Sequence, residues 1–195
     1  MTTPIRIALS GTHSTGKTTL LRRLEMELRA NGRTVARTPA SFAAKAAELG
    51  FPKLQNQTPE CTEWIIAASA AAAAEATLTA DVVLIDRSAL DPVAYYLAAL
   101  ECSGQQPDPD ITERLAGLVK AHIAGYGALV ATVLDPAIPL GDSRDRDLDY
   151  RAAVDRHIHA LLAEHQIPHQ RITGHDDERT VLAGLVSLAS GEVTP

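Results

Sequence analysis

Residues 11–18 read Gly11-Thr12-His13-Ser14-Thr15-Gly16-Lys17-Thr18 and are the strongest indication of the fold in this sequence. Their spacing is G-x-x-x-x-G-K-[ST], the pattern of a loop that binds phosphate. The apolar run at 5–9 predicts a buried strand before the loop, and residues 18–24 predict a helix after it. Glycines let several backbone N–H groups converge on one phosphate, and a helix N-terminus adds positive potential. The alternative is a chance turn rich in Gly, Thr and Ser, which the flanking strand and helix argue against.

We therefore expect a nucleoside triphosphate to bind along residues 11–18 and at the adjacent Thr19. Lys17 can reach the β- and γ-phosphates, and the Thr18 hydroxyl can ligate Mg²⁺. The motif identifies the phosphates of the ligand and says nothing about the molecule that would accept a phosphoryl group.

The sequence has 195 residues, so we expect one domain over 1–195. The formal net charge is −6 and there is no basic cluster, which argues against nucleic acid as a partner. Cys61 and Cys102 form no C-x-x-C motif and are interpreted as reduced thiols. The apolar stretch 65–80 is mostly alanine and is too short and too weakly hydrophobic to span a membrane, so it predicts a helix. No secretory signal precedes the first strand, and we expect a cytoplasmic protein.

Strand-like apolar runs alternate with helical stretches along the chain. This alternation predicts an α/β fold of three layers, with a five-stranded parallel sheet and helices on both faces. Ligands of such sheets bind at the carboxyl ends of the strands. The expected strands are 5–9, 34–37, 82–85, 129–134 and 169–172, and the expected helices are 17–30, 41–49, 59–79, 89–102, 110–125, 147–165 and 176–189.

A second signal follows the strand predicted at 82–85, where four apolar residues end in Asp86 and Arg87. Asp86 would lie near Mg²⁺ and the γ-phosphate, where it could hold a metal-bound water or accept a proton from an attacking hydroxyl. Arg87 could bind an anionic group of the acceptor. The alternative is structural, because Asp86 or Ser88 could cap the helix that follows.

Arginines also occur in a loop after the fourth predicted strand. We expect residues 137–150 to form a lid, with Arg144 stabilising the transferred phosphoryl group and Arg146 as a second candidate. Arg151, one helical turn further on, is a weaker candidate. Closure of such a lid excludes water, which suppresses hydrolysis of the donor. The alternative is a solvated loop of mixed charge.

Weaker signals occur elsewhere. Gly174 follows the last predicted strand and could let the backbone approach the adenine ring, although a glycine also suits a tight turn. Trp64 could stack on an acceptor ring or belong to the core. The seven histidines form no H-E-x-x-H motif, so a zinc site is not expected.

With these motifs placed, the chain resembles the P-loop small-molecule kinases, and most of all the AAA-type kinase domains related to nicotinamide riboside kinase. Thymidylate and deoxynucleoside kinases are more distant relatives. The resemblance implies a single P-loop kinase-like domain that uses ATP and Mg²⁺ and acts on a small molecule. It is carried by Gly11–Thr18, by Asp86–Tyr95, by Leu134-Asp135-Pro136 with Arg144, and by Ile172-Thr173-Gly174 with Glu178-Arg179.

The chain departs from these kinases at residues 37–41, Arg37-Thr38-Pro39-Ala40-Ser41. Kinases of this type often carry a carboxylate in that stretch, facing the acceptor, and this chain has none. Asp86 is therefore the main candidate base. We expect the acceptor pocket to be built from residues 37–41, the helix after Thr58, and residues 87–96.

Three functions are compared on this basis. The first is a kinase that transfers the γ-phosphoryl group of ATP to a nucleoside, a nucleotide or a related metabolite. The second is a GTP switch, which the absence of D-x-x-G and [NT]-K-x-D motifs disfavours. The third is a regulatory ATP-binding module or weak ATPase, which the missing carboxylate keeps open. The oligomeric state is also open, with a homodimer as one option.

Overall fold

A computed structural model describes residues 3–39, 42–137 and 147–191. Strands and helices alternate along the chain, as the sequence predicts, and most boundaries lie within one or two residues of the expected ones. The elements are β1 (Ile5–Ser10), α1 (Lys17–Ala30), β2 (Val35–Arg37), α2 (Phe42–Glu48), the 3₁₀ turn η1 (Leu54–Asn56), α3 (Pro59–Ala76), β3 (Val82–Asp86), α4 (Leu90–Cys102), α5 (Pro109–Ile123), β4 (Ala128–Thr132), α6 (Leu148–Glu164), β5 (Gln170–Ile172) and α7 (His175–Ser190).

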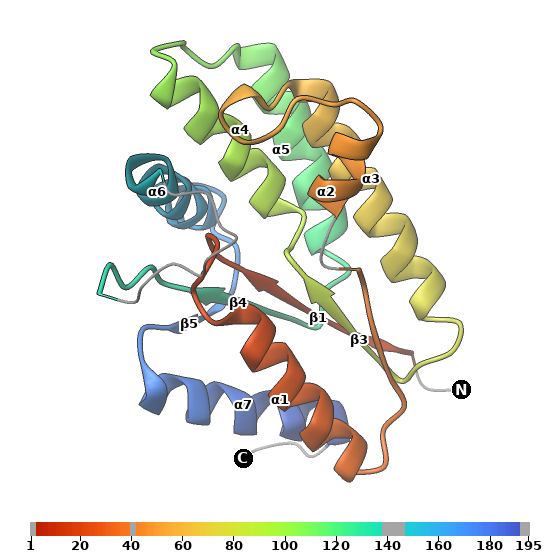
Figure 1. The fold of residues 1–195 in the computed structure, drawn as a ribbon. Coiled ribbons are helices and arrows are strands. Elements are labelled where there is room, and N and C mark those ends of the chain that lie inside the picture. The colour runs from red at the N-terminus through yellow and green to blue at the C-terminus, as the bar shows by residue number, and fades with distance from the viewer. Residues whose placement is uncertain (1–2, 40–41, 138–146, 192–195) are drawn as a thin grey trace.

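The five strands form one parallel sheet in the order β2-β3-β1-β4-β5, and the predicted fold class is confirmed. β1 lies at the centre between β3 and β4 (Figure 1). The chain runs from β1 to one side of the sheet for β2 and β3, and to the other side for β4 and β5. This reversal creates a crevice beyond the carboxyl end of β1, where parallel α/β sheets bind their ligands.

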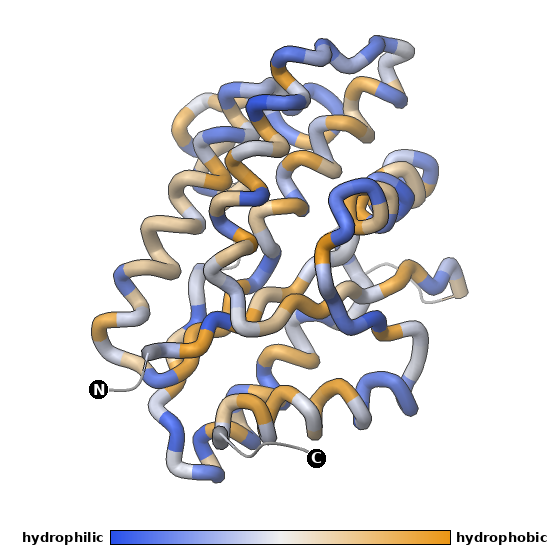
Figure 2. Tube along the Cα trace, turned by 180° about the vertical axis from the view of Figure 1, so that it is seen from behind, coloured by the Kyte–Doolittle hydropathy of each residue, from blue (hydrophilic) through white to orange (hydrophobic). Residues whose placement is uncertain are grey.

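Helices cover both faces of the sheet, with α1 and α7 on one face and α3, α4, α5 and α6 on the other (Figure 1). Successive strand residues point to opposite faces, so each strand contributes side chains to both hydrophobic cores, one on each face of the sheet. On β1, Ile7 and Leu9 pack against α1 and α7, whereas Ala8 packs with α3, α4 and α6. Figure 2 shows hydrophobic and hydrophilic residues interspersed along the helices. Their apolar stripes supply the other half of each core.

Local signals explain where two of the helices begin. Thr58 caps α3, because its hydroxyl accepts a hydrogen bond from the Cys61 N–H at 3.3 Å, and Pro59 occupies the first helical position. At the start of α5, Asp108 is the N-cap residue, whose side chain accepts hydrogen bonds from the N–H groups of Asp110 and Ile111, and Pro109 is the first helical residue. The alanine-rich stretch forms α3 and ends at Ala76. Among the residues that the structure describes, no helix is long and apolar enough to cross a membrane.

Candidate active site

The phosphate loop connects β1 to α1 and lies at the crevice of the sheet. Gly11 has φ +148°, and a Cβ at this position would lie 2.0 Å from the Thr132 Oγ1 atom at the end of β4. Gly16 has φ +83°, in the left-handed region that favours glycine. The hydroxyls of Thr15 and Thr132 are 2.7 Å apart, so the loop is hydrogen-bonded to the end of β4. Both glycines of the motif are therefore required by the backbone.

Lys17 lies across this loop. Its ammonium donates hydrogen bonds to the carbonyl of Thr12 and, at 3.1 Å, to Thr15 Oγ1. The residue is only 5% exposed, although it carries a charge. Thr18, in the first turn of α1, is half-buried, and Thr19 is exposed. The lysine and the two threonines thus lie at the N-terminus of α1, where the helix presents its unpaired N–H groups.

Asp86 ends β3 and is paired in register with Leu9 of β1, two residues before the loop begins. The residue is 5% exposed, and its Oδ2 atom is buried without a hydrogen bond from the described residues. The N-cap residue of α4 is Ala89, so neither Asp86 nor Ser88 occupies that position, although the Ser88 hydroxyl accepts a hydrogen bond from the Leu90 N–H at 3.2 Å. A buried carboxylate oxygen that lacks a hydrogen bond suits a bound cation.

The stretch after β2, in which the expected carboxylate is missing, contacts Asp86 from the other side. The Thr38 hydroxyl accepts a hydrogen bond from the Asp86 N–H at 3.2 Å. The Arg37 guanidinium lies 3.8 Å from Asp86 Oδ2 and 3.7 Å from a carboxylate oxygen of Glu25 on α1. A carboxylate therefore does face this stretch, but it comes from α1 and is paired with Arg37.

Asp91 is a residue of this site that the sequence analysis did not single out. Its Oδ2 accepts hydrogen bonds from the Ser10 hydroxyl at 2.6 Å and from the Ser88 N–H at 3.0 Å, and its Oδ1 accepts one from the Gly11 N–H at 3.1 Å. Arg87 lies 3.7 Å from Oδ1. Asp91 is 1% exposed and joins the phosphate loop to the start of α4. The available signal was the pattern Ser88-x-x-Asp91 before an apolar run, which is typical of the start of a helix.

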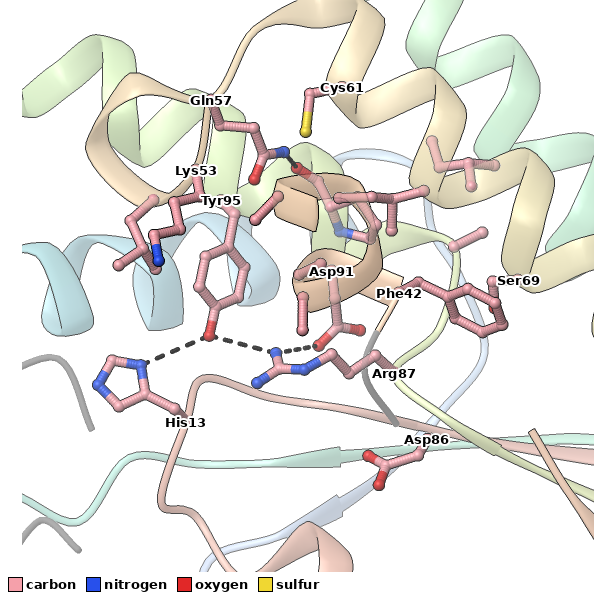
Figure 3. A pocket seen from close by; sticks show the side chains of 18 of the residues that line it. His13, Phe42, Lys53, Gln57, Cys61, Ser69, Asp86, Arg87, Asp91 and Tyr95 are labelled. Atoms are coloured by element: carbon pink, nitrogen blue, oxygen red, sulfur yellow. Dashed lines mark hydrogen bonds and ion pairs between the residues drawn. The ribbon is translucent and has the colours of Figure 1, made fainter. Parts of the chain in front are cut away.

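Arg87 follows Asp86 and adopts φ +80°, which is uncommon for a residue other than glycine. Its guanidinium donates to the Tyr95 hydroxyl at 3.2 Å and lies 5.1 Å from the centre of the Tyr95 ring. The Tyr95 hydroxyl is also 3.5 Å from His13 Nδ1 of the phosphate loop (Figure 3). Burial by itself lowers the pKa of Arg87, but Tyr95 and Asp91 outweigh it, so the pKa is raised. Arg87 is thus a charged group tied to the phosphate loop.

A pocket of about 660 Å³ opens beside these residues (Figure 3). Its polar end is formed by His13, Asp86 and Arg87, and apolar side chains of α2 and α3 line much of the rest. Two of the three segments expected to form it, the helix after Thr58 and residues 87–96, do line it. Of the third, the described residues 37–39 do not, and α2 takes their place. The lining residues are His13, Phe42, Ala43, Ala44, Ala47, Glu48, Lys53, Leu54, Gln57, Cys61, Ile65, Ile66, Ser69, Asp86, Arg87, Ser88, Ala89, Asp91, Pro92 and Tyr95.

Arg151 lies on α6 and reaches the backbone of the phosphate loop. Its guanidinium donates to the carbonyls of His13 and Ser14, each at 3.2 Å, and the residue is 3% exposed. Ser14 adopts φ +56°, which turns its carbonyl away from an ordinary helical or extended path. The arginine considered a weak lid candidate is thus a buried support of the loop backbone.

Asp155 and His159 continue this face of α6 at intervals of four residues. Asp155 Oδ1 accepts a hydrogen bond from the Leu134 N–H at 3.1 Å, just beyond the end of β4. Burial raises the pKa of Asp155, against the opposing charges of His159 and Lys17. Burial likewise lowers the pKa of His159. Burial therefore favours the neutral forms of Asp155 and His159. Arg151 is the charged residue of this face of α6 that contacts the loop.

The remaining sequence candidates are Arg144, Arg146, Gly174 and Trp64. Arg144 and Arg146 fall in residues 138–146, outside the described part of the chain, and residues 148–150 of the predicted lid form the first turn of α6. Gly174 is exposed at the start of α7, and a Cβ there would meet no atom within 4 Å. Trp64 packs against Phe51 with ring centres 6.0 Å apart and does not line the pocket.

Comparisons with known proteins place the chain in a family. Two structures of NadR protein, one in complex with NAD and AMP-PNP and one with NR, give TM-scores of 0.68 and 0.66 at 14% and 15% identity, covering 99% and 96% of this chain. A structure of deoxyadenosine kinase from M. mycoides with bound dATP gives a TM-score of 0.60 at 11% identity, covering 93% of this chain and 98% of that one. The resemblance to P-loop small-molecule kinases is thus confirmed at the level of the fold.

This chain spans about half the length of the NadR chains, 51% in both comparisons. No curated protein matches the sequence. A family model described as an AAA domain matches residues 6–179, which is most of the chain. The protein therefore belongs to this AAA-domain family.

Proposed function

We propose that the protein is an ATP-dependent phosphotransferase that moves the γ-phosphoryl group to a hydroxyl of a nucleoside, a nucleotide or a related metabolite. One observation carries this proposal. The phosphate loop and a separate pocket of about 660 Å³ share a border formed by His13, Asp86 and Arg87. A protein that only binds or hydrolyses ATP needs no second pocket at the γ-phosphate end of its loop, whereas a kinase needs one for the acceptor.

The donor half of the site follows from the phosphate loop. Backbone N–H groups of residues 12–16 would hold the phosphates, and Lys17 would exchange its hydrogen bonds within the loop for the β- and γ-phosphate oxygens. Thr18 and the buried Oδ2 atom of Asp86, which accepts no hydrogen bond from the described residues, would hold Mg²⁺, since this ion prefers oxygen ligands. When bound, the ion would neutralise charge on the phosphates. The AMP-PNP and dATP in the similar structures support an adenine nucleotide as donor.

The acceptor half follows from the residues at the border of the pocket. The acceptor hydroxyl oxygen forms a bond to the γ-phosphorus, the bond from that phosphorus to the β–γ bridging oxygen breaks, and ADP leaves. Asp86 takes the proton of the hydroxyl, and Arg87 binds an anionic or polar group of the acceptor. NR in one NadR structure supports a nucleoside-like acceptor.

Two further residues complete the proposed donor site. Arg144, on the segment between β4 and α6, would close over the phosphates and stabilise the charge of the transferred group. Gly174 stands at the exposed end of β5, where the space around its Cα would admit the flat face of the adenine ring. Closure by the Arg144 segment would also exclude water from the reaction.

The test is Mg²⁺-dependent formation of ADP and of a phosphorylated product from a panel of nucleosides and nucleotides, with ATP and GTP as donors. We expect Lys17→Ala to be nearly inactive and Asp86→Asn to lose about 10²- to 10⁴-fold in kcat, the usual contribution of a general base. The control is Asp110→Asn, an exposed acid in the first turn of α5, which should keep full activity. Tight ATP binding without any phosphorylated product would refute the kinase and favour the regulatory module or weak ATPase.

A further inference from the structure

A polar side chain, that of Gln57, lies at the end of the pocket away from the phosphate loop. Figure 3 shows Gln57 on the opposite side of the pocket from Asp86, with Tyr95 between them. Gln57 precedes α3 and is 8% exposed. Between the two ends the wall is mostly apolar, with Ala43, Ala44, Ala47, Ile65 and Ile66 among its members. An occupant is therefore expected to have a hydroxyl at one end, an apolar or flat body, and a polar group at the other end.

The orientation of the Gln57 amide is determined by its partners. Its Nε2 atom is 2.8 Å from the Pro92 carbonyl oxygen, which can only accept a hydrogen bond. It is also 2.8 Å from Thr62 Oγ1, and that hydroxyl already donates its own hydrogen to the Thr58 carbonyl at 2.9 Å. Both contacts therefore require an N–H donor, and both hydrogens of the amide are used.

The Oε1 atom is consequently the group that Gln57 offers to the pocket. The side-chain hydrogen bonds of Gln57 to the described residues both come from Nε2, and Figure 3 shows Oε1 directed toward the interior, on the side of Tyr95. A rotation of the amide by 180° would place the oxygen against the Pro92 carbonyl and leave a buried acceptor pair without a hydrogen. Such a pair is unfavourable, so the amide is held as an acceptor.

We infer that this site selects acceptors that present an N–H donor, an exocyclic amino or carboxamide group, at the end distant from the reacting hydroxyl. The inference rests on the proposed function and specifies its substrate class as amino- or carboxamide-bearing nucleosides. A carboxylate or an unsubstituted ring carbon in that position cannot donate to Gln57 Oε1, and a carboxylate would face the partial negative charge of the oxygen. Lys53, exposed on the same pocket, is the group that would favour a carboxylate if it controlled selection.

Two pairs of probes isolate the donor group. Adenosine carries an amino group that purine riboside lacks, and nicotinamide riboside carries a carboxamide where nicotinic acid riboside has a carboxylate. With ATP and Mg²⁺ we expect kcat/KM to be about 10- to 100-fold higher for the donor-bearing member of at least one pair, as expected for one hydrogen bond to a buried acceptor. Equal rates within both pairs, or a preference for the carboxylate, would overturn the inference.

Two variants test whether the Oε1 acceptor of Gln57, and the orientation in which its neighbours hold it, determine the preference. Gln57→Met preserves length and removes the acceptor, so the ratio within the preferred pair should fall to about 1, mainly through the donor-bearing probe. Thr62→Val removes one of the two acceptors that hold the amide and leaves the Pro92 carbonyl in place. It weakens the orientation of the amide and should lower the ratio less than Gln57→Met does. Thermal melting of both variants shows whether they are folded. A ratio unchanged in folded Gln57→Met would overturn the inference.

Binding of the same four probes, measured by calorimetry without ATP, distinguishes this inference from the proposed function. Discrimination in binding that disappears in Gln57→Met, without phosphorylation of any probe, refutes the kinase and supports the selection by Gln57. Phosphorylation of both members of each pair at equal rates supports the kinase and refutes the selection. Absence of binding and of phosphorylation for all four probes refutes the selection.

Discussion

Replacing Asp91 by Asn is expected to lower the free energy of unfolding by about 3–5 kcal/mol, the range for breaking a buried charged pair. Asp91 is 1% exposed and its two oxygens accept hydrogen bonds from Ser10, Gly11 and Ser88. An amide has one oxygen, so its NH₂ group must face a donor. At the Oδ2 position the NH₂ group would face two donors that now bind Asp91, Ser10 and Ser88. At the Oδ1 position it would face one such donor, the Gly11 N–H at 3.1 Å, together with the Arg87 guanidinium at 3.7 Å, so this placement is the less unfavourable one.

The estimate follows from these contacts. A buried N–H that loses its acceptor costs about 1–3 kcal/mol, and the bonds that remain lose the strength that the charged carboxylate gave them. Urea denaturation followed by circular dichroism measures the change. With a slope of about 2 kcal/mol per molar urea, the midpoint should fall by about 2 M. Because the lost bond holds Gly11, the affinity for ATP should fall as well.

The matched control is Asp177→Asn on α7. Asp177 also accepts a backbone and a hydroxyl hydrogen bond, both from Thr173, but these contacts are exposed to solvent. A much smaller shift of the midpoint is expected there, because water can replace the lost interactions. If Asp91→Asn lost no more stability than Asp177→Asn, the assignment of Asp91 as the buried join between the phosphate loop and α4 would be wrong.

Three further predictions concern the same region. Gly11→Ala should abolish ATP binding in calorimetry, because its Cβ would lie 2.0 Å from Thr132 Oγ1; near-normal affinity would contradict this. Arg151→Met should weaken ATP binding about 10-fold or more, since two buried carbonyls of the loop lose charged donors; the exposed Arg22→Met is its control. Burial raises the pKa of Cys61, and burial and nearby carboxylates such as Asp147 raise the pKa of Cys102 as well, so access decides the order of reaction. Maleimide should label exposed Cys102 before buried Cys61 at pH 7.5, and faster labelling of Cys61 would contradict this.

The layered fold was predictable because its signals are local. Strand-like runs of four to six residues, most of them apolar, alternate with helical stretches, and the spacing of glycines in the phosphate loop is itself a local motif. The same pattern predicts a parallel sheet but does not give the order of its strands. The register that pairs Asp86 with Leu9 is likewise seen only in the structure.

The partners of the site residues were harder to predict, because they lie far apart in the sequence. Asp91 contacts Ser10 over 81 residues, and Arg151 reaches His13 over 138. A helix with a buried arginine looks the same in sequence whether the side chain meets solvent or a loop carbonyl. The position of α2 in the wall of the pocket was likewise missed, because alanines at helical spacing carry no mark of the cavity they line.

The wall of the pocket has a consequence for how specificity could diverge within such a fold. Most of its residues come from α2, α3 and the segment between them, which are all part of the single connection from β2 to β3. The donor half comes instead from β1, the phosphate loop and the ends of β3 and β4. Substitutions, insertions or whole replacements within that connection can therefore alter the acceptor while the phosphate machinery stays intact. The donor site and the acceptor pocket are thus built from different parts of the chain, and the two parts meet at the carboxyl end of β3, where Asp86 and Arg87 lie.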